Sequence, residues 1–91
     1  MGFKVVFSDN FVNDLKDITS YISRDNPQAA ITLGDALISE ALTLDEHPNR
    51  GSKIRGRSGA KKLIYKNYLI IYEIHGQTVE ILGCIHGSRI Q

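Results

Sequence analysis

The sequence has no tryptophan and only one cysteine, one methionine and two prolines among its 91 residues. A single cysteine excludes an internal disulfide, and Cys84 lies within the apolar run ILGCI, which predicts a buried core residue rather than a reactive thiol. No apolar run approaches the roughly 18 residues that span a bilayer. The opening MGFKVVFSDN also lacks the apolar stretch of a signal peptide. We therefore expect a cytoplasmic protein.

Motifs for metals and cofactors are also missing from the sequence. The three histidines are dispersed and, with the one cysteine, show no zinc-ligand spacing. No glycine-rich motif of the GxxxxGK kind is present to hold phosphates. The sequence therefore predicts neither a cofactor nor a metal site.

Charge is divided unevenly along a chain whose net charge is only +1. Residues 1–49 hold eight acids against three bases, whereas residues 50–91 hold eight bases against Glu73 and Glu80. Seven of those bases lie between Arg50 and Lys66, where there is no acid. This basic stretch predicts either a solvated loop with its strand or a surface that binds an anionic partner.

The first half of the chain predicts a strand and two helices. FKVVF, residues 3–7, is short, β-branched and aromatic, which suits a strand. Ser8 is placed to cap a helix over residues 9–23, whose apolar face is Phe11, Leu15, Ile18 and Ile22. Asn26 and Pro27 then start a second helix that we expect to end near Glu46. The connection is short enough to make an antiparallel helical hairpin, with Gly34 allowing close packing.

The second half predicts a loop and three strands. Residues 47–60 are rich in glycine and bases, which indicates a loop with a short extended piece at 53–55. Strands are expected at 62–66, 68–74 and 78–85, joined by turns short enough for antiparallel neighbours. Tyr68 and Tyr72 fall on one face of the middle strand and are expected to pack in or on the sheet. The length fits one domain, residues 1–91, in the α+β class: an N-terminal strand, a helical hairpin and a three-stranded antiparallel meander, with both helices on one face of a mainly antiparallel sheet.

Several short motifs follow one another in a set order from Phe3 to Arg89. They are the restart NPQAA, a P-x-x-G turn at Pro48 to Gly51, Lys62-Leu63 opening a strand, Asn67-Tyr68 before IIYEI, and the closing VEILGCIHGSR. Together they resemble the ParE branch of the RelE/ParE toxin superfamily of bacterial type II toxin–antitoxin modules, which are also called plasmid stabilisation systems. The resemblance implies a β-α-α-β-β-β fold and a toxin held in a hetero-oligomer by the acidic amphipathic segment of a cognate antitoxin.

Two activities are known in this superfamily. ParE-type members act on DNA gyrase, whereas RelE-type members cut messenger RNA in the ribosomal A site. RelE-like enzymes usually carry a functional tyrosine or histidine after the last basic residue, but only Ile90 and Gln91 follow Arg89 here. The ending His86-Gly87-Ser88-Arg89 is similar to that of ParE-type members. We therefore expect a gyrase inhibitor rather than an enzyme, with a ribosome-dependent endoribonuclease and a non-toxic binding module as alternatives.

Candidate site residues follow from these alternatives. RNA cleavage needs a proton carrier and cations around the phosphate. His86 is the best candidate for the first, since an imidazole ordinarily titrates near 6.5, with Lys62 and Arg89 as catalytic cations. His86 can equally cap the last strand. The residues expected to bind the target or the antitoxin are Arg50, Lys53, Arg55, Arg57, Lys61, Lys62 and Arg89.

Overall fold

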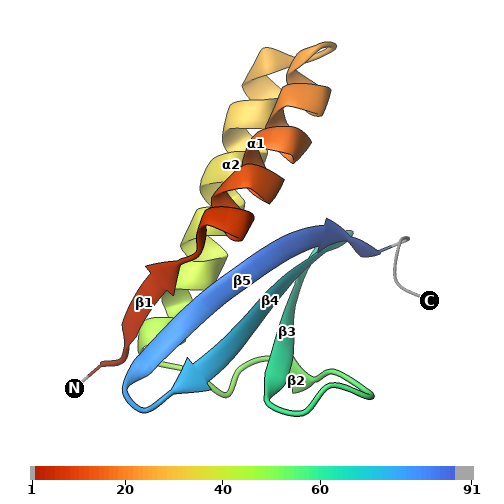
Figure 1. Cartoon of the computed structure of the whole chain (residues 1–91). Coiled ribbons are helices and arrows are strands. Elements are labelled where there is room, and N and C mark those ends of the chain that lie inside the picture. The colour runs from red at the N-terminus through yellow and green to blue at the C-terminus, as the bar shows by residue number, and fades with distance from the viewer. Residues whose placement is uncertain (1, 88–91) are drawn as a thin grey trace.

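The computed structural model describes residues 2–87, and the elements follow one another in the expected β-α-α-β-β-β order with one small strand added (Figure 1). These elements are β1 (Lys4–Phe7), α1 (Asp9–Ser23), α2 (Pro27–Leu42), the 3-10 turn η1 (Thr43–Asp45), β2 (Ser52–Lys53), β3 (Ala60–Tyr65), β4 (Tyr68–His75) and β5 (Thr78–His86). The α+β fold class predicted from the sequence is confirmed. No helix among residues 2–87 is long and apolar enough to cross a membrane.

Both helices begin where their capping residues predict. The Ser8 side chain accepts a hydrogen bond from the Phe11 amide at 3.1 Å, and the Asn26 side chain accepts one from the Ala29 amide at 3.1 Å. Each bond satisfies an amide that has no partner within its helix. Pro27 occupies the first turn of α2, where its missing N–H costs nothing.

The second helix ends earlier than the sequence predicts. Its α-helical part stops at Leu42, and the 3-10 turn η1 carries the chain only to Asp45, whereas we expected helix to Glu46. The Thr43 hydroxyl donates a hydrogen bond to the Glu40 carbonyl at 2.6 Å. This carbonyl would otherwise accept a backbone N–H from the next turn of an α-helix. The apolar stripe itself continues, since Leu44 is fully buried in η1.

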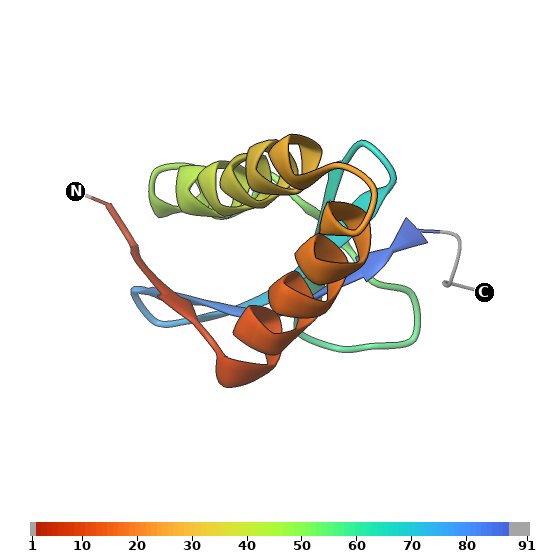
Figure 2. The same ribbon diagram turned by 90° about the horizontal axis from the view of Figure 1, so that it is seen from above.

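The two helices pack side by side and lie against the sheet, α1 on β5 and α2 on β3 (Figure 2). Gly34 is buried at their contact, where a Cβ would stand 3.3 Å from the Thr19 methyl group. The expectation that Gly34 allows close helix packing is therefore confirmed.

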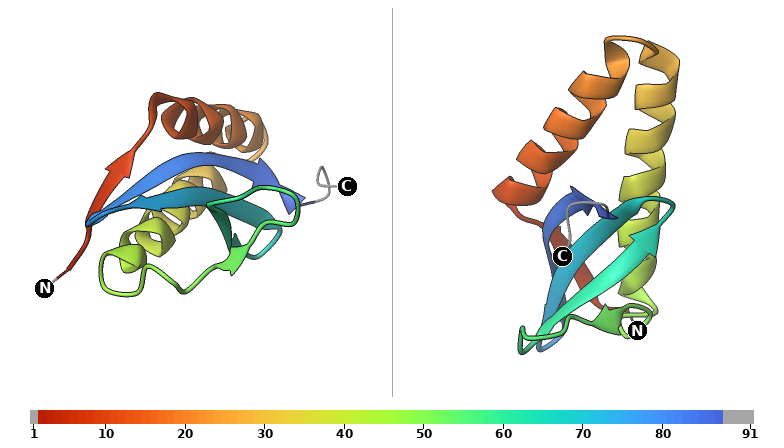
Figure 3. Two further views of the ribbon diagram at one scale, coloured as in Figure 1. Left: turned by 60° about the horizontal axis from the view of Figure 1, so that its bottom comes forward. Right: turned by 90° about the vertical axis from the view of Figure 1, so that its right-hand side faces the viewer.

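The strands form one sheet in the order β1-β5-β4-β3-β2. The pairs β5–β4, β4–β3 and β3–β2 are antiparallel, as the meander predicts, but β1 pairs with β5 in parallel. The helical hairpin carries the chain from β1 to β2 at the opposite edge of the sheet. The three antiparallel pairs β2–β3, β3–β4 and β4–β5 then bring the chain back beside β1, where β5 runs in the same direction as β1. β2 is a two-residue strand beside β3 (Figure 3).

Strand limits differ from the predictions by one or two residues. β3 begins at Ala60 rather than Lys62 and ends at Tyr65, because Lys66 adopts a left-handed turn conformation (φ 52°). The extended piece expected at 53–55 is Ser52–Lys53. β4 and β5 each extend one residue further than predicted, to His75 and His86.

The core lies between the helical hairpin and the sheet. Tyr72 has no exposed surface, and Cys84 is 2% exposed, so the interpretation of Cys84 as a core residue is confirmed. Tyr68 packs against the edge of the same core, as expected from its position four residues before Tyr72. The largest fully buried side chains are Tyr72, Phe11, Leu37, Leu44, Ile70, Ile81 and Val79.

Beyond the end of β1, side chains of α1 form hydrogen bonds with the backbone of β5 that a neighbouring strand would otherwise form. A bulge places Leu82 between the register pairs Tyr72–Ile81 and Ile71–Gly83. Asn10 Nδ2 donates to the Leu82 carbonyl at 2.9 Å, and the Cys84 amide donates to Asp14 Oδ2 at 2.9 Å. The edge of β5 is therefore hydrogen-bonded as far as Cys84.

Candidate functional site

The register of the strands divides the side chains of the sheet between two faces. Paired residues point to the same face, and successive residues alternate. Leu63, Ile70 and Cys84 belong to the core under the helices, so their neighbours point to the opposite side, which we call the outer face. The outer face carries Lys62 and Ile64 of β3, Leu69, Ile71, Glu73 and His75 of β4, and Glu80 and Ile85 of β5.

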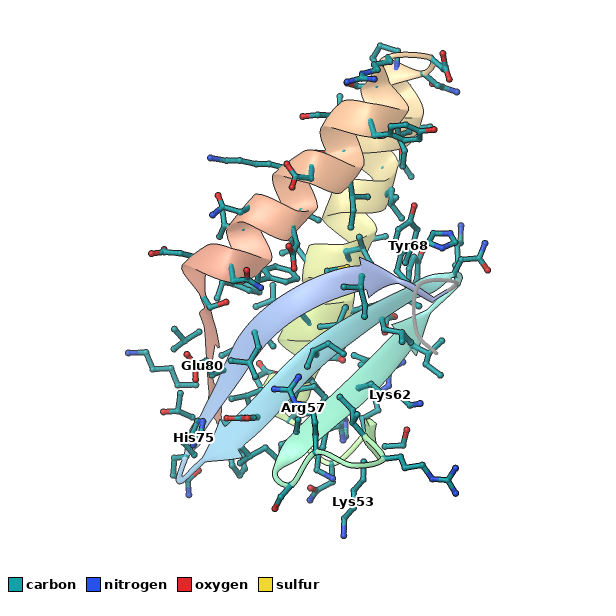
Figure 4. The ribbon with its side chains drawn as sticks, turned by 45° about the vertical axis from the view of Figure 1, so that its right-hand side comes forward. Lys53, Arg57, Lys62, Tyr68, His75 and Glu80 are labelled. Carbon is teal, nitrogen blue, oxygen red and sulfur yellow. The ribbon has the colours of Figure 1, made fainter. Side chains whose placement is uncertain are left out.

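The predicted basic residues lie around β2, β3 and the loop between them. Arg57 comes from that loop and, with Lys62, lies on the face of the sheet turned away from the helices (Figure 4). Lys61 is paired with Lys53 on one side and with Tyr72 on the other, so it points to the helix side. Arg55 is exposed in the loop. The basic stretch therefore wraps one edge of the sheet.

Arg50 is held within the molecule by contacts of its own. Its Nη1 lies 2.9 Å from Glu40 Oε2 and donates to the Thr43 hydroxyl at 2.7 Å. These contacts join the loop after η1 to the C-terminal turn of α2. Arg50 is also exposed, but its contacts with Glu40 and Thr43 give it a structural role and distinguish it from Lys53, Arg55 and Arg57.

The side chain of Tyr72 holds the predicted P-x-x-G turn in place through two hydrogen bonds. Its hydroxyl donates to the Pro48 carbonyl at 2.8 Å and accepts from the Gly51 amide at 3.0 Å. Burial raises the pKa of this hydroxyl above its ordinary value, against smaller lowering effects of the Gly51 amide and the Arg50 charge. The sequence predicts the turn and the packing of Tyr72, but the hydrogen bonds that connect them depend on the tertiary fold.

His86 lies beside a hollow of about 440 Å³ at the end of β5. Its ring packs edge-on against Tyr68, with the ring centroids 5.2 Å apart. The same hollow is lined by Asp14 and Asp17 of α1 and by the exposed Tyr21. Two carboxylates disfavour a phosphate at this position.

The residues predicted for RNA cleavage are not gathered at one place. His86 pairs in register with Tyr68 on the helix side, whereas Lys62 pairs with Ile71 on the outer face. The sheet therefore lies between the candidate proton carrier and one of its candidate cations. Arg89, the third member, lies outside the described residues.

A second hollow, of about 540 Å³, runs between α1 and α2. Val12 and Ile31 are 40% and 59% exposed there, although both are apolar. Lys16 and Asp35 also line it, among mainly apolar and small side chains. A mainly apolar groove that also holds two charged side chains has the character of a binding surface for an amphipathic helix. The sequence showed the two helices but not this groove, because the groove depends on how their faces are rotated.

The fold is shared with chains from two solved toxin–antitoxin systems. The structure resembles a chain of the chromosomal ParDE system from P. aeruginosa with a TM-score of 0.80 at 16% identity, covering 92% of this chain and 95% of that one. It also resembles a chain of the RelBE2 complex from Mycobacterium tuberculosis with a TM-score of 0.69 at 23% identity, covering 94% and 92%. At such identities the likeness shows the shared fold. No curated protein matches the chain in sequence.

Sequence comparison then gives the family. Residues 5–91 match the family described as "ParE toxin of type II toxin-antitoxin system, parDE". The chain therefore belongs to the ParE toxin family of type II toxin–antitoxin systems, and the resemblance inferred from its motifs is confirmed.

Proposed function

We propose that this ParE-type toxin inhibits DNA gyrase in the cytoplasm and is neutralised in a hetero-oligomer with a cognate antitoxin. The observation that carries the choice of gyrase over RNA is the separation of His86 from Lys62 by the sheet. A ribonuclease must bring its proton carrier and its cations to one phosphate, and His86 instead shares its hollow with two carboxylates. Membership of the ParE family supports the same choice.

The basic stretch is the proposed surface for the target. Lys53, Arg55 and Arg57 are exposed, and Lys62 adds a fourth charge on the outer face. No ion pair neutralises any of these four among residues 2–87. Such a cluster attracts an anionic surface, and its contacts weaken as the salt concentration rises. We therefore place the contact with gyrase, or with the DNA that gyrase carries, on this edge of the sheet.

A gyrase supercoiling assay tests this function directly. The purified chain should block supercoiling or trap cleaved DNA, and Arg57→Glu should need about tenfold more protein, a loss of about 1.4 kcal/mol. Arg24→Glu is the matched control, because it makes the same charge change at the far tip of the helical hairpin (Figure 1). It should inhibit like the unchanged chain.

Two results would contradict the proposal. One is full supercoiling at a large molar excess of folded protein. The other is codon-phased cleavage of translated messenger RNA, seen by primer extension, which would support the ribonuclease alternative. Equal loss of inhibition by the Arg57 and Arg24 variants would move the contact away from the basic stretch.

The groove between α1 and α2 is the proposed surface for the antitoxin. Both structural neighbours come from toxin–antitoxin complexes, and the exposed Val12 and Ile31 are apolar surface that a partner would cover. An amphipathic helix can place its apolar side there. Acidic residues elsewhere in the antitoxin would then be free to reach the basic stretch.

Ile31→Glu should weaken binding of the cognate antitoxin at least tenfold, since it places a charge on apolar surface that the complex buries. Isothermal titration calorimetry measures the affinity. Ile64→Glu is a matched control, because Ile64 is 61% exposed against 59% for Ile31 but lies on the outer face of the sheet. An unchanged affinity for Ile31→Glu, or a larger loss for Ile64→Glu, would move the antitoxin to another surface.

A further inference from the structure

Three side chains with metal-binding donors meet on the outer face of the sheet, beside the β4–β5 turn. Glu73 and His75 are two residues apart on β4, and Glu80 lies opposite Glu73 on β5, so all three point to the outer face. His75 Nε2 is 3.0 Å from Glu73 Oε1 and 3.5 Å from Glu80 Oε1, and the three donor atoms lie within 4.8 Å of one another. Figure 4 shows His75 and Glu80 beside the turn, at the opposite end of the sheet from Tyr68.

The strand register brings together two like charges that need a cation. Glu73 and Glu80 are directly opposite each other on antiparallel strands, an arrangement in which two carboxylates repel. Among residues 2–87, no lysine or arginine forms an ion pair with either carboxylate, and their one ion-pair partner is His75. Within the described residues, these two carboxylates are therefore in ion-pair contact with an imidazole and with no lysine or arginine.

The donor set and its spacing suit a divalent transition metal. One imidazole nitrogen with two carboxylate oxygens is a ligand combination that Zn²⁺ accepts, at bond lengths of about 2.0–2.2 Å. Ligands at such lengths around a tetrahedral centre stand about 3.4 Å apart, and the 3.0 and 3.5 Å separations at His75 bracket this value. Partial exposure of all three side chains leaves water able to fill the remaining position.

We propose that Glu73, His75 and Glu80 form a binding site for Zn²⁺ or a similar divalent transition-metal ion. The ligands lie on two paired strands joined by a tight turn at Gly76 (φ 60°), so little ordering is needed to assemble them. A bound ion neutralises the opposed glutamates and links β4 to β5. Because Glu80 is also paired with Val6, the link lies beside the parallel β1–β5 contact.

Isothermal titration of the tag-free full chain with Zn²⁺ tests the site. We expect one ion per chain, and Co²⁺ in its place should give the visible absorption of a low-symmetry site. The unfolding midpoint should rise by about 10 °C or more when Zn²⁺ exceeds its dissociation constant about 100-fold. Mg²⁺ should bind far more weakly, since it does not favour an imidazole ligand.

His75→Ala and Glu80→Gln should each lower the Zn²⁺ affinity at least tenfold. His47→Ala is the control, because His47 is also exposed but lies in the loop after η1, and it should leave the affinity unchanged. Absence of Zn²⁺ binding below millimolar concentration would overturn the proposal and leave His75 as a simple ion-pair partner of the glutamates. Binding that His47→Ala reduces as much as His75→Ala does would also overturn it. None of these outcomes depends on inhibition of gyrase.

Discussion

Replacing Gly51 by alanine is expected to lower the free energy of unfolding by about 3 kcal/mol. A Cβ at this position would stand 2.5 Å from the Lys62 carbonyl oxygen, 2.7 Å from the Tyr72 hydroxyl and 2.9 Å from Tyr72 Cε1. Tyr72 is fully buried and Lys62 contributes backbone, so neither can move away cheaply. The added methyl group must therefore push the turn outward, which breaks the hydrogen bond from the Gly51 amide to Tyr72.

Urea unfolding followed by circular dichroism measures this effect. Ser52→Ala is the control at the next position, since Ser52 is exposed, and it should change the stability by less than about 0.5 kcal/mol. A Gly51→Ala variant as stable as the unchanged chain would show that the turn can shift without cost. Tyr72 would then not fix the loop in the way its two hydrogen bonds indicate.

Cys84 in the folded chain is expected to react with iodoacetamide at pH 8 about 1,000-fold more slowly than in the unfolded chain. Burial, and secondarily the nearby Asp14 carboxylate, raises the pKa of its thiol from 9.0 to about 12. The reactive species is the thiolate, and this rise in pKa reduces the thiolate fraction at pH 8 by about three orders of magnitude. Mass spectrometry of the alkylated chain, with and without denaturant, measures the two rates.

The same shift sets the direction of a pH effect on stability. The folded state holds the Cys84 proton more tightly than the unfolded state does, so this contribution is fully present below about pH 9 and is lost as pH rises toward 12. The free energy of unfolding should therefore fall more steeply over this window than in a Cys84→Ala variant. Equal slopes in the two chains, or rapid alkylation of the folded chain, would contradict the burial of this thiol.

Local signals along the sequence predicted most of the secondary structure. Ser8, Asn26 and Pro27 start their helices where expected, because a cap needs only the amides of its own first turn. The antiparallel meander was predictable because short turns determine its pairing. The end of α2 was predicted too far along, because the apolar pattern continues through η1 while the hydrogen-bonding pattern changes at Thr43.

The candidate site was less accessible to sequence reasoning. Composition located the basic stretch but could not tell that Arg50 is held by Glu40, a contact that depends on the loop returning to α2. The hydrogen bonds of Tyr72 to the P-x-x-G turn join residues more than 20 positions apart. The groove between the helices depends on their relative rotation, which the helical periodicity of each does not determine.

The sequence by itself determined the family, the order of the elements and the division of charge, because motifs, caps and composition are properties of neighbouring residues. Only the tertiary structure placed β1 parallel to β5 and set Glu73 opposite Glu80 beside His75. It also separated His86 from Lys62, which the sequence had grouped as one candidate site. The physical reason is that side chains alternate between the two faces of a strand, so partners depend on a register that is established only when distant strands pair.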